Sequence, residues 1–200
     1  MSENTEKKEN MMDKTVQSID KSRRICTLSE EMIKMLVIQL RSELTNKHLY
    51  MTFANFFGTN GLPKLEEYFI KRAEEEELHH RWIFWYLGYC DAEFQYPAIE
   101  PIKVEIPNYE YPFLVTVDRE IETTMGINKI VEQALAEKDW ATFNWLHGTN
   151  KEEGMLVKEQ VEEESVSRTI ADMAQEGTDW LIKQDSILSF YMGYPGRNND

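Results

Sequence analysis

Residues 91–111, DAEFQYPAIEPIKVEIPNYEY, decide the fold of this 200-residue chain. They include Pro97, Pro101 and Pro107 and show no helical spacing of apolar residues. A proline inside a helix removes a hydrogen bond and clashes with the preceding turn. The segment is therefore predicted to be a long connection that ends at Pro112, where a helix begins. A connection this long lets the helices on its two sides start at the same end of the molecule.

Helical patterns flank this connection on both sides. The first begins at a capping signal, Thr27-Leu-Ser-Glu30, and the second begins at Pro63, after the turn Gly58-Thr-Asn-Gly61. The expected helices run from about residue 30 to 57, 63 to 90, 112 to 138 and 155 to 176, and a short apolar-faced helix covers about 180–191. The sequence thus predicts an all-α fold, a four-helix bundle with a long crossover between helices two and three and a short fifth helix at the C-terminus.

Composition limits the class of protein. The formal charge of −14 speaks against binding to nucleic-acid phosphates, which needs clustered Lys and Arg. No apolar run approaches the roughly 20 residues of a membrane-spanning helix. Because the N-terminus has no apolar signal core and the only cysteines are Cys26 and Cys90, a cytoplasmic location is expected. Residues 1–27 are expected to form a flexible extension, 28–192 the folded domain and 193–200 a C-terminal tail.

Each of the four long helices carries a carboxylate in the middle of its apolar stripe, the line of apolar residues on one helix face. The four acids are Glu43, Glu76, Glu120 and Glu163, and His79 follows Glu76 on the same face. Carboxylates that converge in a bundle interior need a cation to neutralise them. Of the basic residues, only Lys47 is predicted to lie centrally on these stripes. A pair of divalent metal ions is therefore expected, and oxygen-rich donors with one imidazole favour iron or manganese.

Each of these residues also has a plainer interpretation. The runs Glu74–Glu77 and Glu162–Glu164 suit a solvated acidic helix face. A single Glu-x-x-His spacing occurs by chance in many helices, and Tyr50 suits simple packing. The coincidence of four helices, each with an acid on its apolar stripe, favours the metal site over these readings.

The sequence resembles the non-haem ferritins of bacteria and archaea over about residues 28–192. The resemblance is carried by Glu43 with Tyr50 seven residues on, AEEEELHH at 73–80, Glu120 within VDREIETT, TFNWL at 142–146, and KEQVEEES at 158–165. The last block is the most specific of these, since it matches the fourth-helix pattern of that family almost letter for letter. The resemblance implies a ferritin-like fold and a di-iron centre.

The resemblance also implies a role for each matching residue. The ligands of the first iron would be Glu43, Glu76 and His79, with Glu76 bridging to the second iron. The second iron would be held by Glu120 and Glu163, with Gln160 alongside. A third, more weakly held iron would lie at Glu75, Glu159 and Glu162, together with Glu163. Tyr50 matches a tyrosine that can supply an electron, and no haem is expected because Glu77 stands where bacterioferritins carry their haem-binding methionine.

The activity that this resemblance implies is that of a ferroxidase in an iron-storage subunit. Two Fe(II) would be oxidised by dioxygen or hydrogen peroxide, and ferric mineral would be deposited inside a homo-oligomeric cage of twenty-four subunits. Two alternatives remain open. One is a di-iron or di-manganese carboxylate oxidase or peroxidase that builds no cage, and the other is a subunit that only builds or regulates a shell.

The sequence departs from the family pattern in two places. Fourteen residues, WLHGTNKEEGMLVK, separate TFN from EQVEEE, about twice the usual number. The extra residues are expected to form an insertion before Met155, close to the three-fold entry channels of the family. The second departure is the N-terminal extension, which typical members lack.

Overall fold

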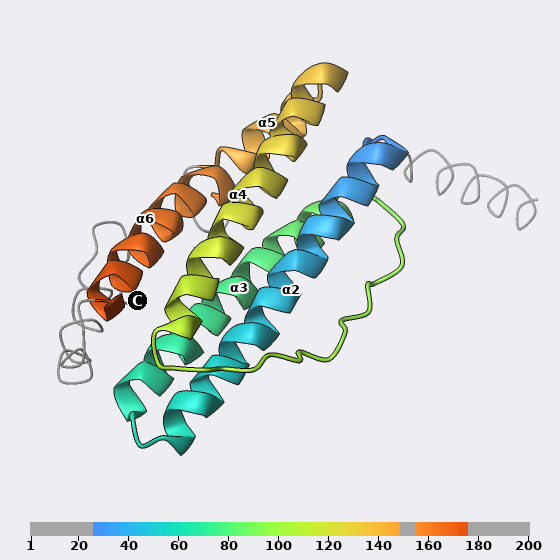
Figure 1. Ribbon diagram of the computed structural model, residues 1–200. Helices are drawn as coiled ribbons and strands as arrows, with labels where there is room; N and C mark the ends of the chain where they lie inside the picture. Colours follow the sequence, from blue (N-terminus) through green and yellow to red (C-terminus); the bar gives the residue numbers. More distant parts are fainter. Residues whose placement is uncertain (1–25, 149–154, 176–200) are drawn as a thin grey trace, which may run out of the picture.

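A computed structural model describes residues 26–148 and 155–175, and these residues form five helices and no strand. The helices are α2 (Glu30–Thr59), α3 (Pro63–Tyr89), α4 (Tyr111–Glu137), α5 (Trp140–Leu146) and α6 (Leu156–Gln175). Helices α2, α3, α4 and α6 lie side by side along one direction (Figure 1), with α2 against α3 and α4, and α6 against α4. The predicted all-α bundle is confirmed. None of the described helices is long and apolar enough to cross a membrane.

The crossover between α3 and α4 runs down the side of the bundle, so that α4 starts at the same end of the molecule as α3 (Figure 1). Its apolar side chains cover the bundle as it passes. Phe94 and Ile99 pack on one half of the core, and Ile102, Val104 and Ile106 pack on the other half. The predicted long connection is thereby confirmed, and it seals part of the core as well as joining two helices.

The helix ends agree with the predicted boundaries to within a few residues, and the predicted capping signal Thr27-Leu-Ser-Glu30 contains the residue that caps α2. The hydroxyl of Ser29, and not that of Thr27, accepts a hydrogen bond from the Met32 backbone N–H at 3.0 Å and caps α2. Pro63 is the first residue of α3, as predicted. Lys138, with a φ of 58°, adopts the left-handed conformation that commonly ends a helix and closes α4.

The segment TFNWL belongs to a separate short helix, α5, which the sequence patterns did not predict. The carboxylate of Asp139 caps it by accepting from the Thr142 backbone N–H at 3.0 Å. The ring of Trp145 stacks on Tyr86 of α3, with centroids 4.1 Å apart. The N-terminal extension (apart from residues 26 and 27), the insertion at 149–154 and the short helix expected at 180–191 lie outside the described residues.

Two apolar clusters fill the bundle and leave a polar layer between them. The aromatic cluster includes Phe53, Phe57, Phe69 and Phe113, and the other includes Leu36, Leu40, Trp82, Ile83 and Ile127. Along α2 the second cluster ends at Leu44 and the aromatic one begins at Leu49; along α3 the aromatic cluster ends at Ala73 and the second begins at Trp82. The middle turns of the helices, which carry the acids, therefore lie between the two apolar clusters.

Candidate metal centre

The four predicted acids lie in the interior and come from four different helices. Glu43 and Glu120 have no exposed surface, and Glu76 and Glu163 are each 1% exposed. Their carboxylate oxygens, together with His79 and Glu159, form three overlapping groups in which the potential ligand atoms lie within 4.8 Å of one another. Glu76 belongs to two of these groups, and so do His79 and Glu163. The acids therefore form one continuous cluster.

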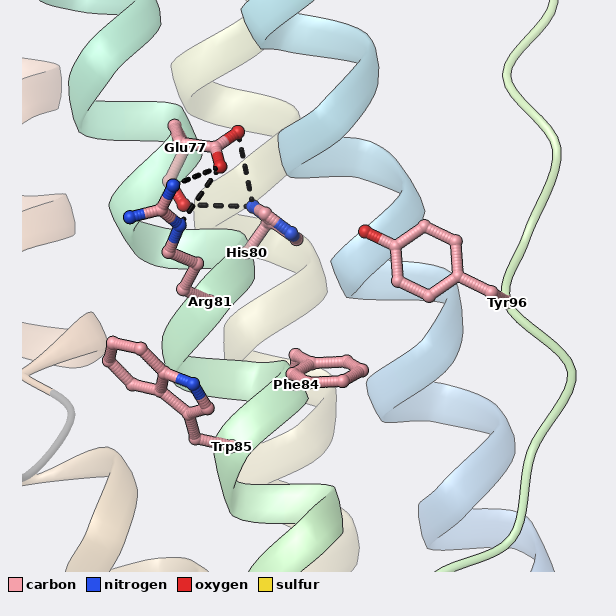
Figure 2. Close-up of a pocket in the computed structure, with 6 residues that line it drawn as sticks. All are labelled: Glu77, His80, Arg81, Phe84, Trp85 and Tyr96. Atoms are coloured by element: carbon pink, nitrogen blue, oxygen red, sulfur yellow. Dashed lines mark hydrogen bonds and ion pairs between the residues drawn. The ribbon is translucent and has the colours of Figure 1, made fainter.

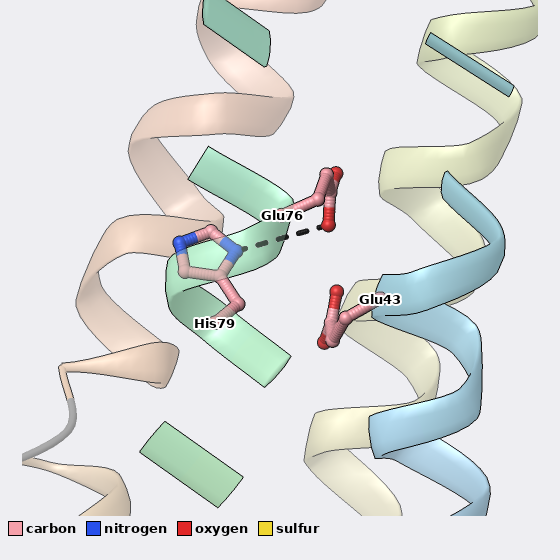
Figure 3. Close-up of side chains that lie close together, drawn as sticks. All are labelled: Glu43, Glu76 and His79. Atoms are coloured by element: carbon pink, nitrogen blue, oxygen red, sulfur yellow. Dashed lines mark ion pairs between the residues drawn. The ribbon is translucent and has the colours of Figure 1, made fainter. Parts of the chain in front are cut away.

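The first group consists of Glu43 from α2 with Glu76 and His79 from α3. The two carboxylates face one another, and the imidazole lies beside Glu76 (Figure 3), with Nδ1 3.9 Å from Oε2 of that carboxylate. In both Glu43 and Glu76, Oε2 is buried and accepts no hydrogen bond from any described residue. Buried carboxylate oxygens without donors are costly. A divalent cation fits this donor set.

His79 joins the first group to α6. Its Nε2 lies 3.1 Å from Oε2 of Glu159 and 3.6 Å from Oε1 of Glu163. These three residues form the second possible ligand group. His79 therefore contacts carboxylates through both ring nitrogens, which places it at the centre of the cluster.

Glu120 on α4 lies on the side of the cluster away from Glu43, in a group with Glu76 and Glu163. Its Oε1 accepts hydrogen bonds from the Tyr50 hydroxyl at 2.7 Å and from Arg72. Its Oε2 accepts from the Gln160 side-chain amide at 2.8 Å. The third ligand group joins Glu120 to Glu76 and Glu163, so Tyr50 and Gln160 lie directly beside the acids, where the resemblance placed them.

Arg72 corrects the prediction that only Lys47 lies centrally on the stripes. Arg72 is fully buried and forms ion pairs with Glu120, Glu75 and Glu163. The Lys47 ammonium instead pairs with Glu77 at 2.5 Å, where both side chains are partly exposed. The signal was present in the sequence, because Arg72 lies one turn before Glu76 and three residues after Phe69 on the buried face of α3.

The residues expected to hold a third iron are only partly brought together. Glu159 and Glu163 share a group with His79. Glu75, however, pairs with Arg72 at 2.8 Å, and neither Glu75 nor the half-buried Glu162 belongs to a ligand group among the described residues. A third iron site at these four acids stays a prediction.

Glu77, next to Glu76 in sequence, faces a different environment. It pairs with Lys47, Arg81 and His80 and lines an open pocket of about 300 Å³ with Phe84, Trp85 and Tyr96 (Figure 2). The ion pairs of Glu77 lower its pKa despite some burial. This pocket shares no residue with the three ligand groups, so the consecutive acids Glu76 and Glu77 point to different sides of α3.

The buried cluster retains protons when no metal is bound. Burial raises the pKa of Glu43 well above its usual range, and the neighbouring Glu76 carboxylate raises it further. Burial also raises the pKa of Glu163, to about 7. For His79, burial opposes protonation, but Glu163, Glu159 and Glu76 outweigh it and raise its pKa well above normal. Protons thus supply part of the positive charge that the carboxylates need.

The metal-free protein should become less stable as pH rises from about 5 to about 8. Glu43, Glu163 and His79 have raised pKa values, so the native state binds protons that the unfolded chain has released. Their contribution is complete below the unfolded pKa and is lost as pH rises through the folded pKa. Thermal unfolding across this range tests the expectation. Glu163→Gln should flatten the decline, and an unchanged slope would contradict the assignment.

Gln39 and Gly126 are supporting residues that the sequence interpretation missed. Gln39, one turn before Glu43, is buried and donates from Nε2 to Oε1 of Glu43 at 2.6 Å. Gly126 on α4 leaves the space that the Gln39 side chain occupies, because a Cβ there would collide with Oε1 of Gln39. The spacing of Gln39 to Glu43 was a usable signal. Nothing in the sequence identified Gly126, because the need for a glycine at this position depends on how closely α2 and α4 approach each other.

Gly126→Ala on α4 should therefore weaken metal binding at Glu43 on α2, because it disturbs Gln39. The added methyl group displaces Gln39 and removes its hydrogen bond to Glu43, and loss of such a supporting partner typically costs roughly tenfold or more in metal affinity. Calorimetric titration with Co(II) measures the affinity. Gly88→Ala is the control, because a Cβ at Gly88 meets no atom within 4 Å; equal affinities in the two variants would contradict the role of Gln39.

The fold and the site together define a class of protein, a four-helix bundle with acids from all four helices and one imidazole in its interior. The family model described as Ferritin-like domain matches residues 33–173, and the chain belongs to the ferritin family. It is 29% identical over 145 residues to the bacterial non-heme ferritin of Campylobacter jejuni, covering 72% of this chain and 83% of that protein. It is 28% identical over 142 residues to that of Staphylococcus aureus, covering 71% and 81%.

A solved structure gives the same result. The open pore ferritin of the archaeon Archaeoglobus fulgidus superimposes with a TM-score of 0.73 at 28% identity, over 82% of this chain and 98% of that one. The resemblance to non-haem ferritins is thus confirmed. Membership of the ferritin family supports iron binding and a role in iron storage.

Proposed function

We propose that this chain is a ferroxidase subunit of an iron-storage cage. It would oxidise Fe(II) at the buried carboxylates and deposit ferric mineral inside a homo-oligomer of twenty-four subunits. The observation that carries the proposal is the pair of buried oxygens, Oε2 of Glu43 and Oε2 of Glu76, that accept no hydrogen bond from the described residues. In a member of the ferritin family, such oxygens are best explained as ligands of Fe(II).

The arrangement suggests two positions for the substrate ions. The first metal position consists of Glu43, Glu76 and His79, and the second consists of Glu120 and Glu163 with Gln160 alongside. Glu76 belongs to a ligand group on each side and is therefore placed to bridge them. A position between anionic oxygens favours Fe(III) over Fe(II), because the more highly charged ion gains more from the same carboxylates.

The reaction needs an electron acceptor and a place for protons. Each of two Fe(II) gives one electron to dioxygen, which takes up two protons and becomes hydrogen peroxide. Hydrolysis of the two Fe(III) to ferric oxyhydroxide then releases protons to water. Tyr50, whose hydroxyl donates to Glu120 at 2.7 Å, is placed to give one further electron to that peroxide, which becomes two water molecules when it also receives an electron from a third Fe(II) and two protons. Glu75, Glu159 and Glu162 are proposed to hold a third iron together with Glu163, which requires Glu75 to leave Arg72.

Aerobic addition of Fe(II) tests the catalytic part of this proposal. Ferric absorbance should rise far faster than in a protein-free blank, and fractions with mineral should elute as a large assembly in size-exclusion chromatography. A rate equal to the blank would leave only a shell-building role. Fast oxidation by a small oligomer would instead favour a di-iron or di-manganese oxidase or peroxidase without a cage.

A further inference from the structure

In the metal-free protein, the carboxylates of the two metal positions differ in the hydrogen bonds and charges that they receive from neighbouring side chains. Both oxygens of Glu120 accept hydrogen bonds, Oε1 from Tyr50 and Arg72 and Oε2 from Gln160. Glu43 and Glu76 each keep a buried oxygen that accepts none from the described residues. The two positions are therefore not equally ready to receive a cation.

Arg72 connects the two acids of the second position. One guanidinium nitrogen, Nη2, pairs with Glu120, and the other, Nη1, lies 3.5 Å from Oε1 of Glu163. The side chain is 1% exposed, and its guanidinium carbon lies 5.6 Å from the centre of the Tyr50 ring. A guanidinium keeps its charge at any pH at which a protein folds. A permanent positive charge thus lies where a second divalent ion would have to bind.

We propose that Arg72 is an internal counter-ion that occupies the second metal position. The resting subunit then binds one divalent ion tightly, at Glu43, Glu76 and His79, and binds a second only when the guanidinium releases Glu120 and Glu163. This inference rests on the proposed function and concerns the order in which the two Fe(II) enter. Because oxidation of a pair needs both ions, Arg72 would control how often a reactive pair forms.

Glu75 can remain paired with the guanidinium after it leaves Glu120 and Glu163. Nη1 of Arg72 already lies 2.8 Å from Oε2 of Glu75, whose side chain is 26% exposed. As long as no third iron occupies Glu75, Arg72 can therefore keep this ion pair while it leaves the two fully buried acids. Water screens a partly exposed pair more than a fully buried one, so the shift moves the positive charge away from the incoming ion and toward water.

Stepwise Co(II) binding tests this order, because Co(II) takes the same oxygen and nitrogen donors and is not oxidised by dioxygen during the measurement. Anomalous scattering from crystals equilibrated at increasing Co(II) gives the occupancy of each position, and calorimetry gives the affinities. Wild-type protein should fill the first position before the second. Arg72→Gln keeps a hydrogen-bond donor for Glu120 but removes the charge, and should raise the second affinity by about tenfold or more. Arg72→Lys keeps the charge and should retain the wild-type order.

Glu43→Gln provides a second test of this inference, which does not depend on whether Arg72→Gln folds. Glu43→Gln removes a ligand of the first position and should abolish tight binding altogether, because Arg72 still fills the second. Equal filling of both positions in wild-type protein, or one tight ion in Glu43→Gln, would overturn this inference and leave the proposed function standing. Absence of Co(II) at both positions in every variant would overturn the proposed function as well.

Discussion

Replacing Glu76 by alanine should nearly abolish rapid Fe(II) oxidation, with a loss of roughly 100-fold or more. Loss of a residue that merely supports a metal ligand typically costs 10–100-fold, and Glu76 belongs to ligand groups on both sides of the cluster. Its removal would leave Glu43 and His79 without their shared partner and would disconnect the two metal positions. Stopped-flow ferric absorbance at two Fe(II) per subunit measures the initial rate.

Glu162→Ala is the matched control for this experiment. Glu162 is also an acid in the predicted ligand set, but it is half-buried and lies outside the three ligand groups. Its removal should leave the first turnover nearly unchanged and mainly alter later turnovers and the fate of the oxidised iron. If the two variants showed equally small losses, the assignment of the reaction to the buried cluster would be wrong.

The fold could be predicted because its signals are local. Pro97, Pro101 and Pro107 exclude a helix in the crossover whatever surrounds them, and Pro63 suits the first turn of a helix in any context. The separate helix α5 could not be predicted in this way. It is held by the stacking of Trp145 on Tyr86 of α3, a contact that depends on tertiary structure.

The buried acids could be predicted for a different reason. A carboxylate on an apolar stripe contradicts the helical pattern, and four such contradictions identify a site. Arg72 also lies on this stripe, but a long basic side chain usually reaches solvent, so its position in the sequence does not predict its burial. The apolar stripes alone therefore predict four acids whose positive charge comes from bound metal. The structure supplies an internal cation, and Glu43 and Glu76 remain the pair that it does not neutralise.

Arg72→Ala should destabilise the metal-free protein by about 3–5 kcal/mol at pH 8, since removal of one partner leaves buried charges uncompensated. Three carboxylates would lose an ion pair, and the unfolding midpoint should fall on the order of 10 °C. Thermal and denaturant unfolding measure the loss. Addition of Glu120→Gln should recover part of it, because one of the uncompensated charges is then absent.

Arg168→Ala is the control for this variant. Arg168 pairs with Glu164 through a side chain that is 58% exposed, and loss of a surface pair should change stability by less than about 1 kcal/mol.

Co(II) should stabilise Arg72→Ala more than it stabilises the wild type, since a divalent ion can then neutralise Glu120 and Glu163 without displacing a guanidinium. Equal stabilisation of both proteins would mean that Arg72 and the second ion do not compete. A fall in stability no larger than that of Arg168→Ala would mean that the guanidinium does not neutralise the buried acids. The charge balance of this centre thus depends on one residue of α3, and a bound divalent ion should offset part of the stability that is lost with it.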